Sequence, residues 1–144
     1  MLMLQPRVVR FAGITLENVT HVTLSREPAR EVVEWSDAGP YAVFADVPEQ
    51  RTIVVLRQEL VREDWGDVRP GTTGTLTIVT APSGADGRRR RLTATAVVLS
   101  STADVRGGSS DGRAPRAERS LRLVLVSPDG AADPVAMTDA GAEP

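Results

Sequence analysis

Residues 71–101 carry the clearest alternation of polar and apolar positions in the chain. Two runs rich in β-branched residues, Thr72 to Thr80 and Leu92 to Leu99, flank a segment of Ala, Pro, Ser, Gly and Asp. This pattern predicts two antiparallel strands joined by a long hairpin loop. Because successive side chains of a strand point to opposite faces, we expect Leu76 and Ile78 on one face with the alternate alanines of the second run.

The opposite face of this predicted hairpin is rich in threonine. Its members include Thr75, Thr77, Thr93 and Thr95. A sheet face of this kind is neither a dry core nor an ordinary charged surface, and it suits a smooth, hydrated wall. The alternative is that threonine is present only because it favours strands. Both interpretations stay open on the sequence alone.

Short apolar or alternating runs, separated by turn residues, continue along the rest of the chain. We expect strands at Val8 to Phe11, Ile14 to Leu24 with a kink at Glu17-Asn18, Arg30 to Trp35, Tyr41 to Ala45, and Ser120 to Ser127. We expect a break at Glu27-Pro28, a turn at Ser36 to Pro40, and a second connector at Asp46 to Gln50.

The segment Arg51 to Arg62 differs because its first half is apolar on both faces. Ile53 to Leu56 therefore predicts cover from both sides, by a second sheet or by a neighbouring subunit. The second half either continues as a strand or turns helical, with Glu59 to Trp65 as the best position for a helix.

These elements predict an all-β fold, a sandwich or barrel of about seven or eight antiparallel strands with at most one short helix. We expect a single domain over residues 1–127. Residues 104–119 are dominated by Gly, Ser, Pro and charge, which predicts a mobile loop. Residues 128–144 have little packing potential and are expected to form a flexible tail.

Composition narrows the classes of function. The chain has 144 residues, no cysteine and a formal net charge of -2, so thiol chemistry is excluded and no overall basic field attracts nucleic acid. Aromatic residues make up only 3%, which disfavours a base-stacking groove for single strands. No apolar run approaches the roughly 20 residues that span a bilayer, and we expect no signal peptide and no membrane partner.

Catalytic and metal-binding patterns are weak. His21 is the single histidine and lies in a predicted strand, where packing or surface exposure is the simpler interpretation. Glu63, Asp64 and Asp67 lack the spacing of a calcium loop and are interpreted as a solvated turn. We therefore predict no enzyme activity, no cofactor and no metal site.

The most conspicuous charge feature is a run of four arginines, Arg88, Arg89, Arg90 and Arg91. One interpretation is a solvated loop base whose charge protects a sheet edge. The other is a docking surface for acidic groups of another subunit, with Glu49, Glu63-Asp64 and Asp67 as suitable partners, or, as the less favoured variant, for nucleic-acid phosphate. Subunits with complementary ends can stack head to tail.

The order of these elements resembles the tail tube proteins of long-tailed bacteriophages, whose fold is shared with the type VI secretion tube protein. The resemblance spans Val8 to Val126 and rests on DVPEQRTIVVLRQEL, on DWGDVRPGTTGTLTI leading into the long hairpin, and on the closing strand RSLRLVLV. It implies a β-sandwich that forms hexameric rings, and rings that stack into a hollow tube through which DNA passes.

By that resemblance the threonine face lines the lumen, and Arg88 to Arg91 together with Glu49 form contacts between rings. The implied partners are further copies of the chain and other tail proteins, in a virion assembled in the host cytoplasm. Two alternatives remain: a single-ring tail terminator, distal tail or adaptor protein of the same fold, or a monomeric β-sandwich binding module. A hydrolase centred on His21 is the weakest alternative.

Overall fold

A computed structural model describes residues 2–4, 6–60, 68–80, 89–106 and 116–139. Within these ranges every regular element is a strand, and the all-β prediction is confirmed. The strands are β1 (Leu2–Leu4), β2 (Pro6–Phe11), β3 (Ile14–Leu16), β4 (Val19–Trp35), β5 (Ala42–Leu60), β6 (Thr73–Thr80), β7 (Arg90–Arg106), β8 (Arg116–Val126) and β9 (Ala136–Asp139). The strands β4, β5 and β7 are much longer than the short strands predicted.

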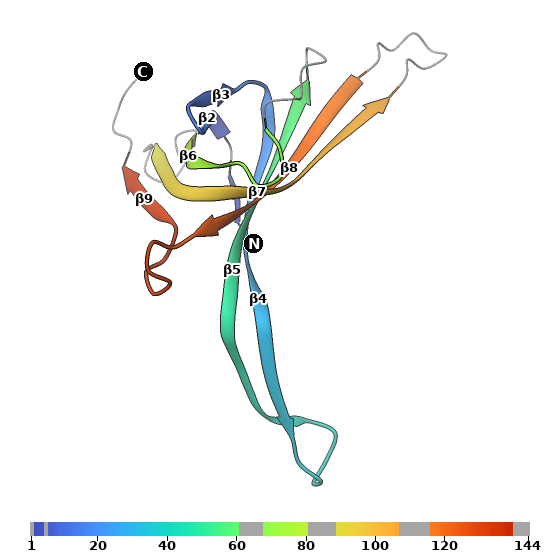
Figure 1. The fold of residues 1–144 in the computed structure, drawn as a ribbon. Coiled ribbons are helices and arrows are strands. Elements are labelled where there is room, and N and C mark those ends of the chain that lie inside the picture. Colours follow the sequence, from blue (N-terminus) through green and yellow to red (C-terminus); the bar gives the residue numbers. More distant parts are fainter. Residues whose placement is uncertain (1, 5, 61–67, 81–88, 107–115, 140–144) are drawn as a thin grey trace.

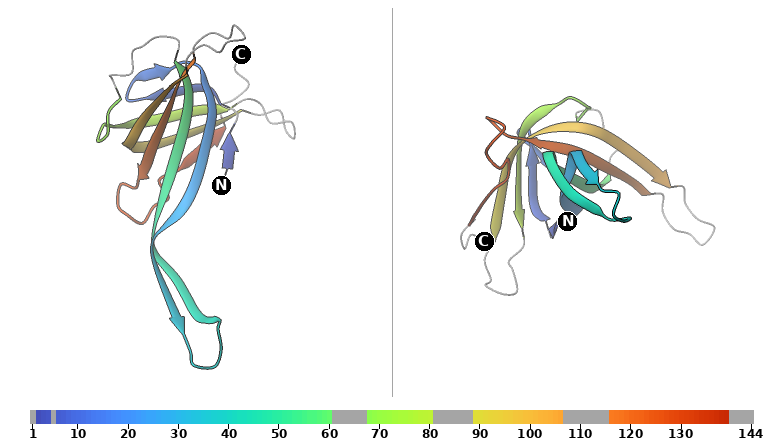
Figure 2. Two further views of the ribbon diagram at one scale, coloured as in Figure 1. Left: turned by 90° about the vertical axis from the view of Figure 1, so that its right-hand side faces the viewer. Right: turned by 90° about the horizontal axis from the view of Figure 1, so that it is seen from below.

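All strands belong to one antiparallel sheet with the order β1-β4-β5-β8-β7-β6-β2-β3, and β9 pairs with β7 beside it (Figure 1). The strands β1 and β2 stand near opposite ends of this order although one residue separates them in sequence. The sheet therefore has to curl back on itself, as Figure 2 shows, but it is not closed into a barrel. Its two ends approach each other, because β3 at one end is followed within three residues by β4 near the other, and β2 contacts β4 without pairing with it.

The concave side of the curled sheet holds the hydrophobic core. Strands β2 and β3 contribute side chains to one side of this core and β5, β7 and β8 to the other, so the two halves of the sheet pack face to face. Its largest fully buried members are Phe11, Leu56, Leu76, Ile78, Leu92, Leu121 and Leu123. Burying each of these side chains stabilises the fold by about 1.5–3 kcal/mol.

The predicted central hairpin is present as β6 and β7. Its faces divide as expected: Leu76 and Ile78 are fully buried in the core, together with Ala94 and Ala96 of β7. The single kinked strand predicted over Ile14 to Leu24 was wrong: the chain breaks at the expected kink into β3, which pairs with β2, and β4, which pairs with β1 and β5, with Asn18 between them at φ of +57°.

Two predicted interruptions were wrong. Strand β4 continues through Pro28, and β5 continues through the expected connector at Asp46 to Gln50. Proline interrupts an interior strand because it lacks an N–H, but it is tolerated at edges and bulges. The pairing register shifts between Pro28 and Arg30 and again between Arg30 and Val32, opposite Pro48, so both prolines lie at irregularities of a two-stranded ribbon.

Cover on both faces of β5 comes from within the chain. Val54 and Leu56 enter the core, while Ile53 is only 1% exposed on the opposite face. The carboxylate of Glu27 on β4 accepts from Arg122 on β8 at 3.5 Å, and these two residues lie on either side of Ile53 in the register. This ion pair crosses above Ile53, so neither a second sheet nor a neighbouring subunit is needed to bury it.

Several other segments differ from their expected structure. Strand β5 runs to Leu60, so Glu59 and Leu60 are not helical; residues 61–67, the rest of the possible helix, lie outside the described ranges. Strand β7 extends to Arg106 and β8 begins at Arg116, both inside the segment expected to be a loop. In the segment expected to be a tail, β9 pairs with β7 and Val135 packs against the core.

Candidate assembly surface

Beyond the body of the molecule, β4 and β5 continue as a long two-stranded arm (Figures 1 and 2). We define the arm as residues 27–51, because β8 pairs with β5 only from Thr52 onward. Ten residues of β5 therefore extend past the body, or about 33 Å at about 3.3 Å per residue. The predicted turn at Ser36 to Pro40 forms its tip.

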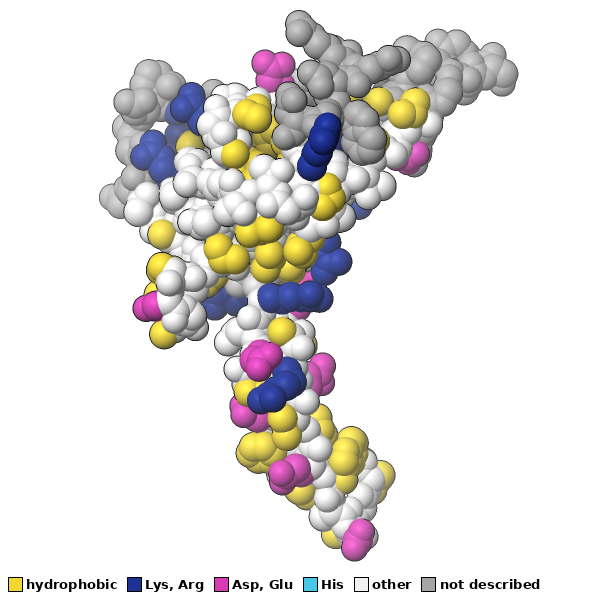
Figure 3. Space-filling model, viewed as in Figure 1, with side chains coloured by type: hydrophobic (Ala, Val, Ile, Leu, Met, Phe, Trp, Pro, Cys, Tyr) yellow, Lys and Arg dark blue, Asp and Glu magenta, His cyan; other side chains and the backbone are white. Residues whose placement is uncertain are grey.

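The arm is solvated on both faces but is rich in apolar side chains (Figure 3). Every residue from Pro28 to Arg51 is exposed. The large exposed apolar residues of the arm are Val32, Val33, Trp35, Tyr41, Val43, Phe44 and Val47. Contiguous apolar surface on a protruding element is typical of an interaction site rather than of a free surface.

The pairing register divides the arm into two chemically different faces. Val33 lies opposite Ala45, on the other side of the ribbon from Val32 and Glu34. Trp35 and Val47 are exposed next to them along the strands, at shifts of the register that interrupt strict alternation; we call Val33, Ala45, Trp35 and Val47 together the apolar arm face. Val32 lies opposite Asp46, and Glu34 lies opposite Phe44; these four residues form the acidic arm face. The two faces share no residue, so each can contact a different partner.

Charge on the outer arm has one sign. Residues 31–48 contain four carboxylates, Glu31, Glu34, Asp37 and Asp46, and no arginine. Among the described residues, the carboxylate of Asp46 accepts only from the N–H of its neighbour Val47, at 2.9 Å. Glu34 has no hydrogen-bond or ion-pair partner among the described residues. The outer arm is therefore a negatively charged, apolar ribbon.

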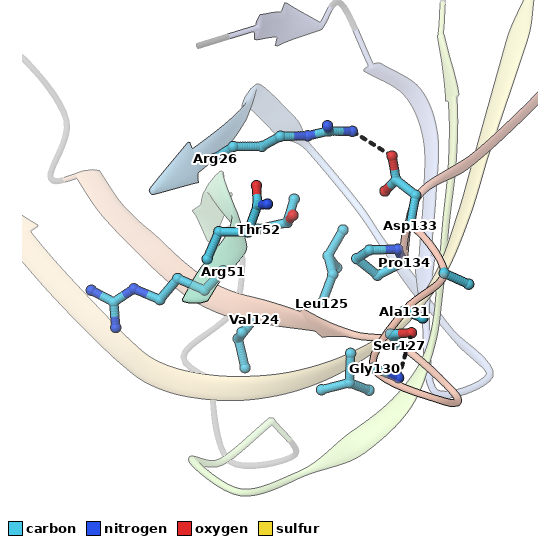
Figure 4. A pocket seen from close by; sticks show the side chains of 13 residues that line it. Arg26, Arg51, Thr52, Val124, Leu125, Ser127, Gly130, Ala131, Asp133 and Pro134 are labelled. Carbon is cyan, nitrogen blue, oxygen red and sulfur yellow. Dashed lines mark hydrogen bonds and ion pairs between the residues drawn. The ribbon is translucent and has the colours of Figure 1, made fainter. Parts of the chain in front are cut away.

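At the base of the arm, charges are paired within the chain. Arg30 lies 3.9 Å from Glu49, and Arg26 reaches Asp133 at 2.6 Å across a hollow of about 560 Å³ (Figure 4). Val124 and Leu125 form part of the wall of this hollow. The N–H of Val135, together with the Arg26 guanidinium, lowers the pKa of Asp133 below its ordinary value. These contacts attach the β8–β9 connection to the arm.

Beside Asp133, the turn after β8 is organised by Asp129. Its carboxylate accepts from the N–H groups of Ala132 at 2.8 Å and Ala131 at 2.9 Å, and from the Ser127 hydroxyl at 3.1 Å. Because these donors stabilise the ionised form, they lower the pKa of Asp129.

The four threonines singled out in the sequence lie together on the outer face of the sheet. Thr75 is paired with Thr95, and Thr77 with Thr93, as direct cross-strand neighbours. Thr75 and Thr95 are exposed, whereas Thr77 and Thr93 are half-buried. The structure thus brings all four into one polar, uncharged wall, while the idea that this wall lines a lumen stays a prediction.

The arginine run and Glu49 lie on separate elements. Arg90 and Arg91 are exposed at the start of β7, Arg89 is half-buried, and Arg88 lies outside the described residues. Glu49 lies on the arm, where Arg30 already partners it. The structure does not bring these predicted contact residues together within one chain, and their role between rings stays a prediction.

Around Arg91, the register assembles a mixed apolar and cationic surface. Val8 of β2 lies opposite Val79 of β6, which lies opposite Arg91. Two residues along β6, Thr77 pairs with Arg10, which places Arg10 on the same face. We call Val8, Arg10, Val79 and Arg91 the basic patch. Arg10 and Arg91 are exposed and have no ion-pair partner among the described residues.

His21, the weak catalytic candidate, is exposed, and its Nδ1 lies 3.0 Å from the hydroxyl of the neighbouring Thr20. The described residues contain no cluster of three His, Cys, Asp or Glu side chains suited to a metal, and Glu63, Asp64 and Asp67 lie outside them. No helix long and apolar enough to cross a bilayer occurs in those residues either.

Sequence reasoning missed the arm. It treated Pro28 and Pro48 as ends of separate elements, although valines and carboxylates occur on both sides of the Ser36 to Pro40 turn. That near-symmetry is the signal that predicts one long hairpin. No protein-family model matches the chain, and no curated protein matches its sequence.

Proposed function

We propose that the protein is a structural, self-assembling subunit of the tail tube class, forming hexameric rings that stack into a hollow conduit for DNA in a virion. The apolar arm face is the observation that carries this proposal. Trp35 is 65% exposed, Val47 46% and Val33 42%, on the part of the β4–β5 ribbon with which no other described strand pairs.

Covering the apolar side chains of the arm with a partner protein is favourable in free energy. Removing apolar surface from water contributes about 25 cal/mol per Å², so each of these large side chains contributes on the order of 1 kcal/mol when a partner covers it. A two-stranded ribbon with no core of its own is at best marginally stable in water. Packing of the arm against neighbouring subunits would supply the missing burial.

The threonine wall supports a conduit rather than a binding site. Hydroxyl groups keep a surface hydrated, and Thr75, Thr77, Thr93 and Thr95 carry no charge that would hold phosphates in place. Arg10, which pairs with Thr77, and Arg91, two residues before Thr93, lie at the rim of this wall, where the next copy would cover them. In a tube the four threonines would line the lumen and let DNA pass without sequence-specific binding. Arg89 to Arg91, at one end of the same strands, would lie where the next ring meets the wall.

Light scattering over a concentration series, followed by negative-stain electron microscopy of the same fractions, tests the proposal. Rings or hollow tubes support it. A single ring that does not stack would favour the terminator, distal tail or adaptor alternative. A monomer at every concentration and salt would exclude spontaneous assembly and favour the binding module.

An arm-deleted chain is the matched control. Replacing residues 31–48 with Asn-Gly joins Arg30 to Glu49, which already face each other in the register, through a turn that suits hairpins. None of the removed residues belongs to the hydrophobic core. This variant should fold and stay monomeric under conditions in which the full chain assembles.

A further inference from the structure

We infer that the acidic arm face of one copy docks on the basic patch of a neighbouring copy. The inference rests on the proposed self-assembly and specifies which two surfaces meet. Glu34 and Asp46 would pair with Arg10 and Arg91, while Phe44 packs against Val8 and Val79.

Charge complementarity identifies the partner as a second copy. The outer arm has four carboxylates and no arginine. By contrast, β2, β6 and residues 90–103 of β7 contain arginines and no carboxylate. Each surface therefore presents the charge that the other lacks, and complementary potentials both steer association and fix its register.

Apolar side chains accompany the charges on both surfaces. Phe44 is 48% exposed and Val32 is 38% exposed on the arm, and Val8 is 40% exposed on the patch. A contact between the two faces would bury these side chains at its centre and place the ion pairs around them, which is the usual anatomy of a protein interface.

The spacing of the charges also matches. Glu34 and Asp46 lie on adjacent strands two residues apart along the ribbon, which places their Cα atoms about 8 Å apart. Arg10 and Arg91 lie on either side of β6 and are offset by two residues, or about 12 Å. The long arginine side chains can bridge that difference.

Other occupants fit these surfaces less well. The arm points away from its own body in Figures 1 and 2, so the contact cannot form within one chain. Pairing of two arms would bring four carboxylates of each together, which is repulsive. An anionic membrane would repel the outer arm for the same reason.

The contact joins two different surfaces, so it is heterologous and repeats from copy to copy. From the sequence, Glu49 was the expected acidic partner of the arginine run. Because Glu49 is paired with Arg30 at the arm base, we assign that role to Glu34 and Asp46 instead. The apolar arm face points the opposite way and remains available to a second neighbour.

Charge reversal tests the docking directly. We expect Glu34→Arg with Asp46→Arg, and separately Arg10→Glu with Arg91→Glu, to raise the concentration needed for association about tenfold or more. Mixing these two variants should restore association, because every arm then meets a patch of opposite charge. Glu59→Arg with Glu118→Arg makes the same change in net charge as the arm variant, on two exposed body residues that pair with each other away from the basic patch, and should assemble normally. Thermal unfolding of each variant checks that it folds.

Cross-linking gives a second readout, since the chain has no cysteine of its own. Asp46→Cys in one population and Arg91→Cys in another should yield dimers with a short bis-maleimide, whereas Val33→Cys on the opposite arm face should not. The docking would be overturned if either charge-reversed variant assembles as well as the wild-type protein, or if the mixture of the two variants stays dissociated. Both outcomes would leave the proposed function intact. Cross-linked dimers of a chain that never forms rings would support the docking and count against the tube.

Discussion

Gly74 on β6 lies directly beneath the turn that joins β2 to β3. A Cβ built at this position would lie 2.6 Å from the Ala12 Cβ and 2.8 Å from the Ala12 Cα. The Ala12 N–H also donates to the Thr75 carbonyl at 3.1 Å, which holds the turn against the strand. The contacted atoms belong to backbone and to a short side chain, so no flexible group can move away. We therefore predict that Gly74→Ala destabilises the fold.

The expected cost follows from overpacking. Inserting a carbon into a packed site costs about 1–3 kcal/mol. Replacing glycine in a strand recovers about 0.4–1 kcal/mol through the unfolded chain, so the difference between the middles of the two ranges predicts a net loss of about 1–1.5 kcal/mol. For a chain of this length that corresponds to a fall in Tm of about 2–8 °C.

Urea unfolding followed by circular dichroism measures this loss, with Gly39→Ala as the matched control. Gly39 lies at the arm tip, where an added Cβ meets nothing within 4 Å. Adding Ala12→Gly to Gly74→Ala should recover part of the stability, because it removes the closest contact and relieves an alanine held at φ of +52°. If Gly74→Ala is no less stable than Gly39→Ala, the close packing of this turn on β6 is refuted.

Three further predictions concern the body, the arm and pH. Gln58→Leu should lower the free energy of unfolding by about 2–4 kcal/mol. The reason is that the Gln58 Oε1 accepts from Nη2 of the buried Arg119 at 2.6 Å and from its Nε at 3.2 Å. A loss under about 0.5 kcal/mol in urea unfolding would contradict this prediction. Trp35→Ser should leave the free energy of unfolding unchanged within about 0.5 kcal/mol, since the side chain is 65% exposed, but should weaken self-association in sedimentation velocity. The pKa of Asp129 is lowered from its ordinary 3.8. The stability that the ionised Asp129 gives to the folded turn is therefore fully present above pH 3.8 and is lost as the pH falls through the lower folded pKa. Hydrogen exchange at Ala131 and Ala132, corrected for intrinsic rate, should therefore lose protection at acid pH, and Asp129→Asn should remove that dependence.

The arm shows how local rules can give a wrong boundary. Proline removes a donor, and in an interior strand that loss interrupts pairing. Pro28 and Pro48 instead occur at register shifts of a two-stranded ribbon, where the regular ladder is already interrupted and a missing N–H is tolerated. Whether a strand has one neighbour or two is a property of the sheet order, which neighbouring residues do not encode.

Local alternation determined the all-β class, the β6–β7 hairpin and the placing of Leu76 and Ile78 on the buried face opposite the threonines. These features depend on the two-residue alternation of side chains along a strand, which is a local pattern and can be recognised in the sequence. Arg119 shows the limit of that reasoning: its polar surroundings predict a loop, but it is a buried strand residue held by Gln58, 61 positions earlier.

Tertiary structure alone decided where separate segments meet. The strand order places β1 and β2 near opposite ends of the sheet, the curl brings these ends together, and β7 provides the edge on which β9 forms. The same long-range pairing leaves the arm without a partner and places Arg10 beside Arg91 across β6. Such contacts depend on register between distant strands, and the free energy that selects a register comes from the whole core rather than from any one run of residues.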